Sequence, residues 1–280
     1  MSYVLTLSCP DAPGLVYAVT RWIAESGGNI LDSQQFTDTS DDEFFLRVHF
    51  EVPDAELDGL RDGFTPVAQA HAMDHQLVVA ERPARTLVMV STEAHCLNDL
   101  LFRQSTGSLP IEVPAVVSNP TALQRLAEQY DVPFHPVPVT AATKAEAEAH
   151  LLRLVDELQV DLVVLARYMQ ILSDDACRAL DGRAINIHHS FLPSFKGARP
   201  YQQAHDRGVK LIGATAHYVT ADLDEGPIIE QGVLRVDHRQ TPADLARAGR
   251  DVEAPTLSRA IRLHAESRVL RNGPRTVVFD

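Results

Sequence analysis

Hydrophobic and polar residues in the first 80 positions follow the periods of alternating strands and helices. Tyr3 to Cys9 alternates as a half-buried strand does, and an Asp-Ala-Pro-Gly turn leads into a helical period from Leu15 to Ser26. Two further strands, a second helix and a last strand are expected at residues 30–37, 43–52, 55–70 and 75–80. This order predicts a ferredoxin-like βαββαβ domain over residues 1–82, followed by a linker at residues 81–85.

From Thr86 the pattern changes to short, unbroken apolar runs that alternate with helical segments, which is typical of a parallel sheet buried on both faces. The expected strands are 87–91, 113–118, 134–137, 162–166 and 184–188, with helices at 97–104, 123–130, 144–158 and 174–180 between them. Strands at 211–220 and 228–236 and a helix at 242–266 follow. The sequence therefore predicts an α/β protein whose second domain, residues 83–280, is a mostly parallel open sheet.

Composition narrows the class of ligand. The 280 residues carry 38 acidic side chains against 25 lysines and arginines, a formal charge of -13. This charge disfavours nucleic acids and anionic membranes as partners, so a small-molecule ligand is expected. No apolar run approaches the ~18–20 residues that span a bilayer, and the N-terminus lacks the basic start of a secretory signal. The three cysteines, an odd number at unrelated spacings, suit reduced thiols and a cytoplasmic protein.

The densest group of reactive side chains lies at the end of the strand at 184–188 and in the loop after it. Strand alternation places Asn186 and His188 on one face and the two isoleucines between and before them on the other. Ligands bind at the carboxyl ends of strands in open parallel sheets, so an amide and an imidazole are expected to meet in a site there. A hydrogen-bonded structural pair at a strand end is the alternative.

A second group of polar residues follows the strand at 211–220. Three carboxylates come within four residues around Gly226: Asp222, Asp224 and Glu225. Asp224 is suited to pair with a histidine from another loop, which would fix the tautomer of the imidazole and raise its basicity. A solvated acidic turn is the alternative. His205 and His217 are expected in the core or on the surface, because nothing in the sequence provides either with a partner.

Together these stretches resemble the formyltransferase family that uses 10-formyltetrahydrofolate. The matching motifs are Asn-Ile-His at 186–188, Ser-Phe-Leu-Pro-Ser-Phe-Lys-Gly at 190–197, Gly-Ala-Thr-Ala-His-Tyr-Val-Thr at 213–220 and Leu-Asp-Glu-Gly-Pro at 223–227. Upstream, Leu-Ala-Arg-Tyr-Met-Gln-Ile-Leu at 165–172 is similar to the stretch that lines the family's pterin pocket. The resemblance runs from residue 86 to the C-terminus and implies a formyltransferase-type fold.

The first domain is similar to an ACT domain. The residues that carry this resemblance are Asp11 and Gly14 of an Asp-x-x-Gly turn, and Asn29 and Ile30 of a Gly-Asn-Ile element. The resemblance implies an amino-acid effector bound near these four residues, with backbone N–H groups at the helix start receiving its carboxylate. A plain turn in an oligomer-forming domain is the alternative. Because ACT domains commonly pair, a homo-oligomer, with four subunits as the expected number, is also implied.

The resemblance implies a catalytic triad of Asn186, His188 and Asp224. Breaking a formamide requires a stabilised oxyanion, a deprotonated water and a protonated leaving amine. An asparagine N–H can donate to the oxyanion, a contribution of roughly 3–4 kcal/mol in comparable sites. A histidine that titrates near neutrality is the usual proton carrier. Asp224 would orient His188 or the attacking water.

Substrate contacts are implied for residues on several loops. They are Arg167, Tyr168, Met169, Ile171, Leu172, His95, Thr220 and Gly226. Folate ends in glutamate carboxylates, for which Arg167, Lys196 and Arg199 are the basic candidates, with surface solubility as the alternative role. No cofactor is expected, since 10-formyltetrahydrofolate is the substrate. No metal site is expected either, because no His/Cys spacing fits one and His188 and His189 would point oppositely on a strand.

An ACT domain ahead of a formyltransferase fold implies hydrolysis of 10-formyltetrahydrofolate to formate and tetrahydrofolate, which supplies formate for purine biosynthesis and balances one-carbon folate pools. Transfer of the formyl group to an amine and a non-catalytic amino-acid sensor are the alternatives. Relatives that formylate glycinamide ribonucleotide carry a Gly-Ser-rich phosphate-binding loop after the first strand. The equivalent loop here, residues 92–98, has no glycine and adds Glu93, which favours hydrolysis. In it, His95 would hold water or start a helix, and Cys96 is expected to pack.

Overall fold

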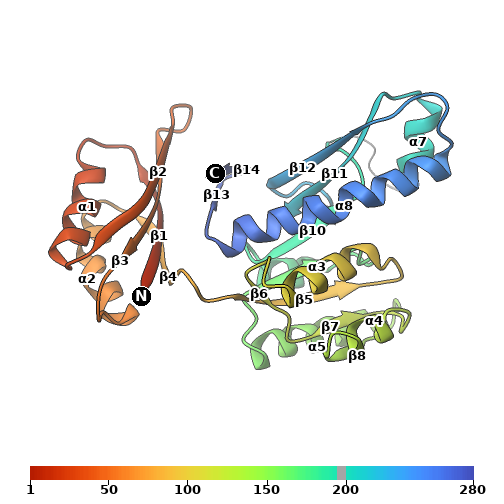
Figure 1. Ribbon diagram of the computed structural model, residues 1–280, viewed down its shortest axis with the longest axis horizontal. Coiled ribbons are helices and arrows are strands. Elements are labelled where there is room, and N and C mark those ends of the chain that lie inside the picture. Colours follow the sequence, from red (N-terminus) through yellow and green to blue (C-terminus); the bar gives the residue numbers. More distant parts are fainter. Residues whose placement is uncertain (194–199) are drawn as a thin grey trace. The chain divides into compact units, whose positions relative to one another are not determined.

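The computed structural model describes residues 1–193 and 200–280, which divide into two compact units (Figure 1). Unit 1 consists of residues 1–82 with 266–272 and 276–280, and unit 2 of residues 83–265 with 273–275. The sequence pattern assigns everything after residue 82 to the second domain, so the C-terminal segment differs from expectation. It joins unit 1 because the buried guanidinium of Arg47 donates to the carbonyl oxygens of Glu266 and Ser267.

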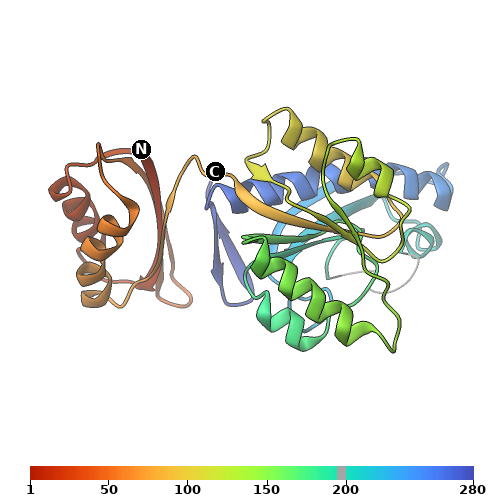
Figure 2. The ribbon, with the colours of Figure 1, turned by 90° about the horizontal axis from the view of Figure 1, so that it is seen from below.

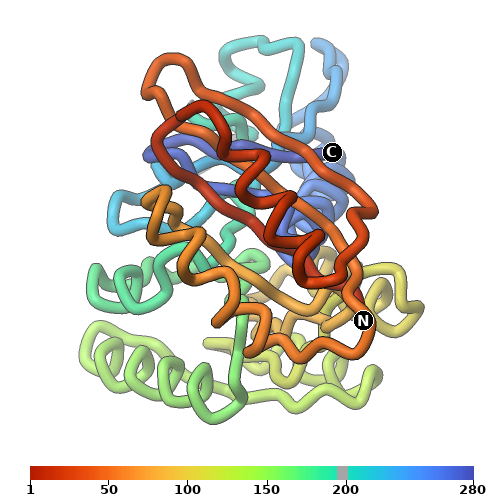
Figure 3. The backbone as a smooth tube through the Cα atoms, turned by 90° about the vertical axis from the view of Figure 1, so that its left-hand side faces the viewer, coloured from red at the N-terminus to blue at the C-terminus, as the bar shows by residue number. Residues whose placement is uncertain are grey.

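Unit 1 is a four-stranded antiparallel sheet in the order β2-β3-β1-β4. Its elements are β1 Ser2–Pro10, α1 Leu15–Glu25, β2 Asn29–Asp38, β3 Glu43–Glu51, α2 Leu57–Ala70 and β4 Asp74–Val79. Both helices cover one face of the sheet (Figure 2) and lie in front of the strands in Figure 3. There the ring of Trp22 in α1 packs against both Phe50 of β3 and Phe64 of α2. The predicted ferredoxin-like order is confirmed.

Strand register separates the residues predicted to bind an effector: Asp11, Gly14, Asn29 and Ile30. Asp11 follows β1, whose end pairs with Glu43 at the start of β3, whereas Asn29 pairs with Glu51 at the other end of β3. Eight residues of antiparallel strand span roughly 27 Å. The loop before α1 and the start of β2 therefore lie at opposite ends of the sheet, so these four residues do not meet within a single chain.

Unit 2 contains a mixed sheet in the order β12-β11-β10-β9-β5-β7-β8, with the short strand β6 paired to β5. The strands are β5 Ala84–Val90, β6 Ile111–Glu112, β7 Val116–Ser118, β8 Phe134–Pro136, β9 Leu162–Leu165, β10 Ala184–His188, β11 Leu211–Tyr218 and β12 Ile228–Arg235. Strands β5 to β10 pair in parallel, and β11 and β12 add to β10 in antiparallel fashion. The predicted mostly parallel sheet is confirmed.

Helices cover both faces of this sheet. They are α3 His95–Ser105, α4 Gln124–Glu128, α5 Lys144–Glu157, α6 Asp174–Ala179, α7 Pro200–Asp206 and α8 Pro242–Ala265. α3 and α8 lie on one face, and α5 and α6 on the other (Figure 2). Short α7 and the hairpin of β13 Val269–Asn272 and β14 Arg275–Val278 have no counterpart among the expected elements, because neither carries a clear hydrophobic period. Within the described residues, no helix combines the length and hydrophobicity that crossing a bilayer requires.

Candidate active site

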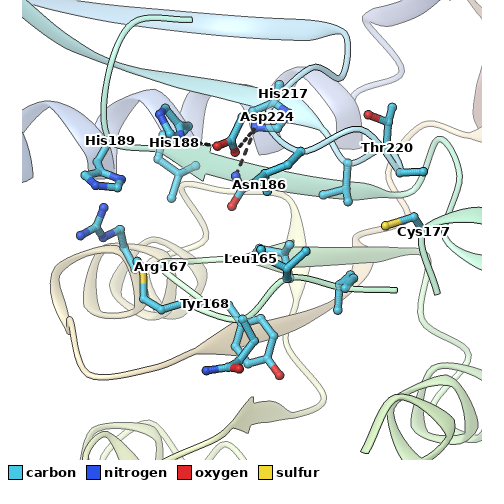
Figure 4. Close-up of a pocket in the computed structure, with 18 residues that line it drawn as sticks. Leu165, Arg167, Tyr168, Cys177, Asn186, His188, His189, His217, Thr220 and Asp224 are labelled. Atoms are coloured by element: carbon cyan, nitrogen blue, oxygen red, sulfur yellow. Dashed lines mark hydrogen bonds and ion pairs between the residues drawn. The ribbon is translucent and has the colours of Figure 1, made fainter. Parts of the chain in front are cut away.

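The carboxyl ends of β9 and β10 border a cavity of about 320 Å³ in unit 2 (Figure 4). Its apolar lining comes from the end of β9, the loop after it and the segment after β11: Leu165, Tyr168, Met169, Ile171, Leu172, Val219 and Leu223. The polar and ionisable groups gather at the end of β10 and around it: Arg167, Asn186, His188, His189, His217 and Asp224. The cavity thus offers a surface for a flat, apolar ligand next to groups that can move protons.

Strand pairing brings the amide and imidazole groups together. In the antiparallel register of β10 and β11, Asn186 lies opposite His217. The side-chain nitrogen Nδ2 of Asn186 is 3.1 Å from Nε2 of His217, whose Nδ1 is 2.8 Å from the carbonyl oxygen of Tyr218. Because a carbonyl oxygen only accepts, Nδ1 of His217 carries the proton and Nε2 accepts from Asn186. The second N–H of Asn186 is then available to a ligand.

His217 belongs to the site, although the sequence predicts a core or surface position without a role. Its side chain is buried and lines the cavity. Burial lowers the pKa of the imidazole, and the Tyr218 carbonyl and the Asp224 charge oppose that effect only in part. His217 is therefore neutral at neutral pH and acts as a fixed acceptor for Asn186. Strand alternation alone could not reveal this, because it does not say which strand pairs with β10.

Asp224 reaches the cavity from the turn after β11, with a left-handed φ of 56° that aspartate tolerates. Its Oδ2 lies 3.2 Å from Nδ1 of His188, as the dashed line in Figure 4 marks. A carboxylate accepts, so Nδ1 of His188 donates and Nε2 carries the lone pair. This Nε2 is buried and has no hydrogen-bond partner among the described residues. It is the nitrogen available to a water molecule or to a leaving amine.

Asp224 is ionised although it is largely buried. Burial by itself raises the pKa of its carboxyl, but the hydrogen bond from His188 and the charges of the neighbouring histidines outweigh it, and the pKa falls below its ordinary value. An ionised carboxylate fixes the tautomer of His188 and favours the imidazolium that forms when Nε2 takes a proton. The structure thus brings Asn186, His188 and Asp224 together as a connected group.

A buried carboxylate in α8, Glu253, joins a second polar cluster, and it is only 1% exposed. Its Oε2 lies 2.7 Å from Nε2 of His95 and 3.5 Å from Nε of Arg167, and its Oε1 accepts from the Tyr201 hydroxyl at 2.7 Å. Burial raises the Glu253 pKa, but the His95 hydrogen bond, the Arg167 charge and the Tyr201 hydrogen bond lower it further than burial raises it. His95 faces Glu253 and is not among the residues that line the cavity, so its substrate contact stays a prediction.

Glu253 is a residue that the sequence does not single out. It lies on the buried face of α8, one turn from Gly249 and one turn from Leu257. An acidic residue at a position that the helical period assigns to the core is the signal that marks it. Its partners come from α3, the loop after β9 and α7, which only the fold brings together.

His95, Cys96 and Glu253 place three donor atoms within 4.8 Å of one another, as a metal site would. Two features oppose a cation there. Arg167 lies 3.5 Å from the same carboxylate. Burial, reinforced by the Glu253 charge, raises the pKa of the Cys96 thiol well above its usual range, whereas metal binding requires the thiolate. We interpret the cluster as hydrogen-bonded charges, with Cys96 packed in the core.

The other predicted site residues divide into two groups. Five predicted substrate contacts line the cavity: Tyr168, Met169, Ile171, Leu172 and Thr220. Arg167 also lines it, while Lys196 and Arg199 lie outside the described residues. The expectation that His188 and His189 point oppositely is wrong. Their ring centroids are 5.2 Å apart and both line the cavity, because β10 ends at His188 and alternation stops there.

Gly226 does not line the cavity, although the resemblance implies a substrate contact for it. It lies in the acidic turn and packs against the end of β11. A Cβ atom at this position would overlap the carbonyl oxygen of Tyr218 and come within 3.3 Å of Nδ1 of His217. Glycine therefore lets the turn pack directly against the end of β11. That close packing holds Asp224 next to His188.

Two family models match the chain: formyl transferase over residues 84–261 and ACT domain over residues 3–78. A formyltetrahydrofolate deformylase of Corynebacterium sp. (strain P-1) is 52% identical over 280 residues, 99% of this chain and 98% of its own length. The crystal structure of a formyltetrahydrofolate deformylase from Burkholderia mallei matches with a TM-score of 0.95 at 49% identity, over 100% of this chain and 99% of that one. A glycinamide ribonucleotide transformylase from Symbiobacterium toebii matches at 34% identity with a TM-score of 0.66, over 71% of this chain and 95% of its own.

Fold, site and family models define the class: an ACT domain joined to a formyl transferase domain with an Asn-His-Asp site. The likeness to the transformylase covers part of the chain, whereas the likeness to the two deformylases covers both domains. The chain belongs to the formyltetrahydrofolate deformylase family.

We expect Gly226→Ala to disconnect Asp224 from His188. The added methyl group has to displace the turn from β11, and overpacking of this kind destabilises by about 1–3 kcal/mol. Long-range ¹H–¹⁵N NMR spectra of the histidine side chains should then lose the signature of a single His188 tautomer. Gly59→Ala is the control, because nothing lies within 4 Å of a Cβ there. An unchanged His188 spectrum in Gly226→Ala would show that the turn does not hold Asp224.

Proposed function

We propose that this enzyme hydrolyses 10-formyltetrahydrofolate to formate and tetrahydrofolate with Asn186, His188 and Asp224 as its catalytic residues. Similarity over the full chain to formyltetrahydrofolate deformylases supports the reaction. One observation carries the residue roles: His188 donates to Asp224 through Nδ1, and its buried Nε2, which has no partner among the residues that the structure describes, lies in the same cavity as the Asn186 amide.

The reaction begins when water attacks the formyl carbon. His188 Nε2 takes a proton from this water as the new C–O bond forms, and the Asp224 carboxylate stabilises the resulting imidazolium. The carbonyl oxygen becomes an oxyanion, to which the second N–H of Asn186 donates. Donors of this kind are held in place before the reaction, as Asn186 is by His217, and contribute roughly 3–4 kcal/mol.

The tetrahedral intermediate then collapses. The oxyanion electrons re-form the carbonyl, the bond from carbon to N10 breaks, and the proton on His188 Nε2 passes to N10. Tetrahydrofolate and formic acid result, and the acid loses its proton to solvent as formate. One imidazole serves as base and then as acid, which requires the single free nitrogen that the hydrogen bond to Asp224 leaves.

The apolar residues that line the cavity can pack against the fused rings of the folate. Met169 and Ile171 are 58% and 61% exposed, so a flat ring system bound against them would cover apolar surface that now faces water. Burial of such surface contributes about 25 cal/mol per Å². Tyr168, Leu172 and Thr220 are proposed to complete this part of the site.

Water, and not an amine, is proposed as the acceptor. Residues 92–94 lead directly into α3, whose first turn holds residues 95–98, and this stretch contains no glycine that would expose backbone amides to a phosphate. Glu93 in this loop is partly exposed and adds a charge that repels a phosphate. Both features disfavour formyl transfer to glycinamide ribonucleotide, the alternative.

Purified enzyme with 10-formyltetrahydrofolate alone should release formate, measured by a coupled formate dehydrogenase assay. A large excess of glycinamide ribonucleotide should leave this rate unchanged and give no formylated nucleotide by mass spectrometry. Formylated nucleotide that appears faster than formate would establish the transferase instead, with the same triad and a different acceptor.

Asp224→Asn and His188→Ala should each lower turnover by at least about 10²-fold, the lower range for general acid–base groups, while substrate binding survives. Asp222→Asn is the matched control, because the same change two residues earlier affects an exposed side chain that does not line the cavity. Steady-state kinetics and circular dichroism test this. Near-normal turnover in a folded Asp224→Asn or His188→Ala enzyme contradicts the triad.

We also propose that the ACT domain binds a free amino acid and that the chain forms a homo-oligomer, with four subunits as the expected number, in the cytoplasm. Gly14 adopts a φ of 96° immediately before α1, which directs the first N–H groups of the helix toward the loop that contains Asp11. Asn29 and Ile30 lie at the other end of the sheet. A site that used all four residues would need two copies of the chain side by side.

Calorimetric titration with the twenty amino acids should give heat for one or a few of them, and Gly14→Ala should abolish it. A side chain strains the left-handed backbone and moves the helix start. Gly107→Ala imposes the same strain at a φ of 67° in unit 2 and should leave binding intact. Twenty flat titrations would give the domain a purely structural role.

A further inference from the structure

Among the described residues that line the cavity, Arg167 is the one arginine or lysine. It follows β9 directly, and its side chain is 14% exposed. Its φ of 65° is uncommon for a bulky residue, and such backbone outliers gather at functional sites. A buried positive charge on a strained backbone, inside a reaction cavity, calls for a ligand-related explanation.

The guanidinium of Arg167 has N–H groups that the described residues leave without an acceptor. Its Nε and Nη1 are buried without a hydrogen-bond partner in the described part of the chain. Oε2 of Glu253 lies 3.5 Å from Nε, beyond the 2.7–3.2 Å typical of N–H···O bonds, and is itself 2.7 Å from His95. Unpaired buried donors are costly, and a bound acceptor would remove that cost.

Arg167 points to the reacting end of the cavity. Figure 4 shows its guanidinium directed toward His189, whose ring is 5.2 Å from that of the proposed catalytic His188. Burial, followed by the charges of Arg167 and His188, lowers the pKa of His189 to about 4. His189 is neutral at neutral pH, so among the described lining residues Arg167 supplies the fixed positive charge beside the triad.

We propose that Arg167 binds the formate that the reaction releases, as a subsite for a one-carbon carboxylate. The inference rests on the proposed hydrolysis, because formate is its product. Several N–H donors on one plane match a carboxylate, and their charge attracts the anion once the bond to N10 has broken. Glu253, held by His95 and Tyr201, is a positioning residue that keeps the guanidinium beside the cavity.

A one-carbon carboxylate fits Arg167 better than the glutamate tail of folate, the role expected for it from the sequence. The guanidinium is largely buried and is directed toward His189 (Figure 4). A glutamate tail that extends into solvent would need an exposed partner. Formate forms next to His188 and has to travel only past His189.

The test measures formate binding directly. Sodium [¹³C]formate is titrated into the enzyme with saturating tetrahydrofolate, with ¹³C NMR relaxation as the readout of affinity. Arg167→Met should weaken formate binding at least about tenfold, the lower range for hydrogen bonds to a charged group. Arg167→Lys keeps the charge without the planar fork and should fall in between. Arg239→Met removes an exposed arginine and is the matched control.

Two results would overturn the inference. Equal formate affinity in wild type and Arg167→Lys or Arg167→Met is one. The other concerns the Arg167 variants with unchanged formate binding. If their KM rises for the glutamylated substrate but not for the analogue that ends at the benzoate, Arg167 binds the glutamate tail. Arg167→Lys provides the measurement if Arg167→Met does not fold. Titration with added formate needs no turnover, so absence of formate release by the wild type would overturn the hydrolysis separately.

Discussion

The hydrogen bond between His188 and Asp224 organises the catalytic end of unit 2. It joins the end of β10 to the turn after β11, and it decides which nitrogen of His188 carries the proton. Nε2 of His188 is therefore the nitrogen that can act as a base, and it is buried without a hydrogen-bond partner among the described residues. The pairing of β10 with β11 and the close packing at Gly226 place the turn where this bond can form.

Burial determines the charges of the histidines around this bond. Burial lowers the pKa values of His217 and His189, and the charge of Asp224 offsets that effect only in part. His188 instead donates a hydrogen bond to Asp224. Neutral His217 then accepts a hydrogen bond from Asn186, and neutral His189 lies between His188 and Arg167. His188, paired with Asp224, is the proposed proton carrier. One turn carboxylate thus separates the roles of three neighbouring imidazoles.

A second buried carboxylate, Glu253, holds a polar cluster behind Arg167. Its hydrogen bonds to His95 and Tyr201 satisfy it, and Arg167 adds a charge that is only partly neutralised. The cavity therefore has a negative group at Asp224 and a positive group at Arg167 with neutral His189 near both. Such an arrangement favours a reaction in which a neutral formamide becomes an anion.

Local spacing alone places Asn186 and His188 on one face of a strand and Asp224 in a turn, and the periods predict both domains. These features depend on neighbours within a few residues, which the sequence contains. His217, Glu253 and the opposite positions of Asp11 and Asn29 depend on which strands pair, in what register, and on which helix face meets the sheet. Those choices follow from contacts between residues far apart in the chain, so only the tertiary structure decided them.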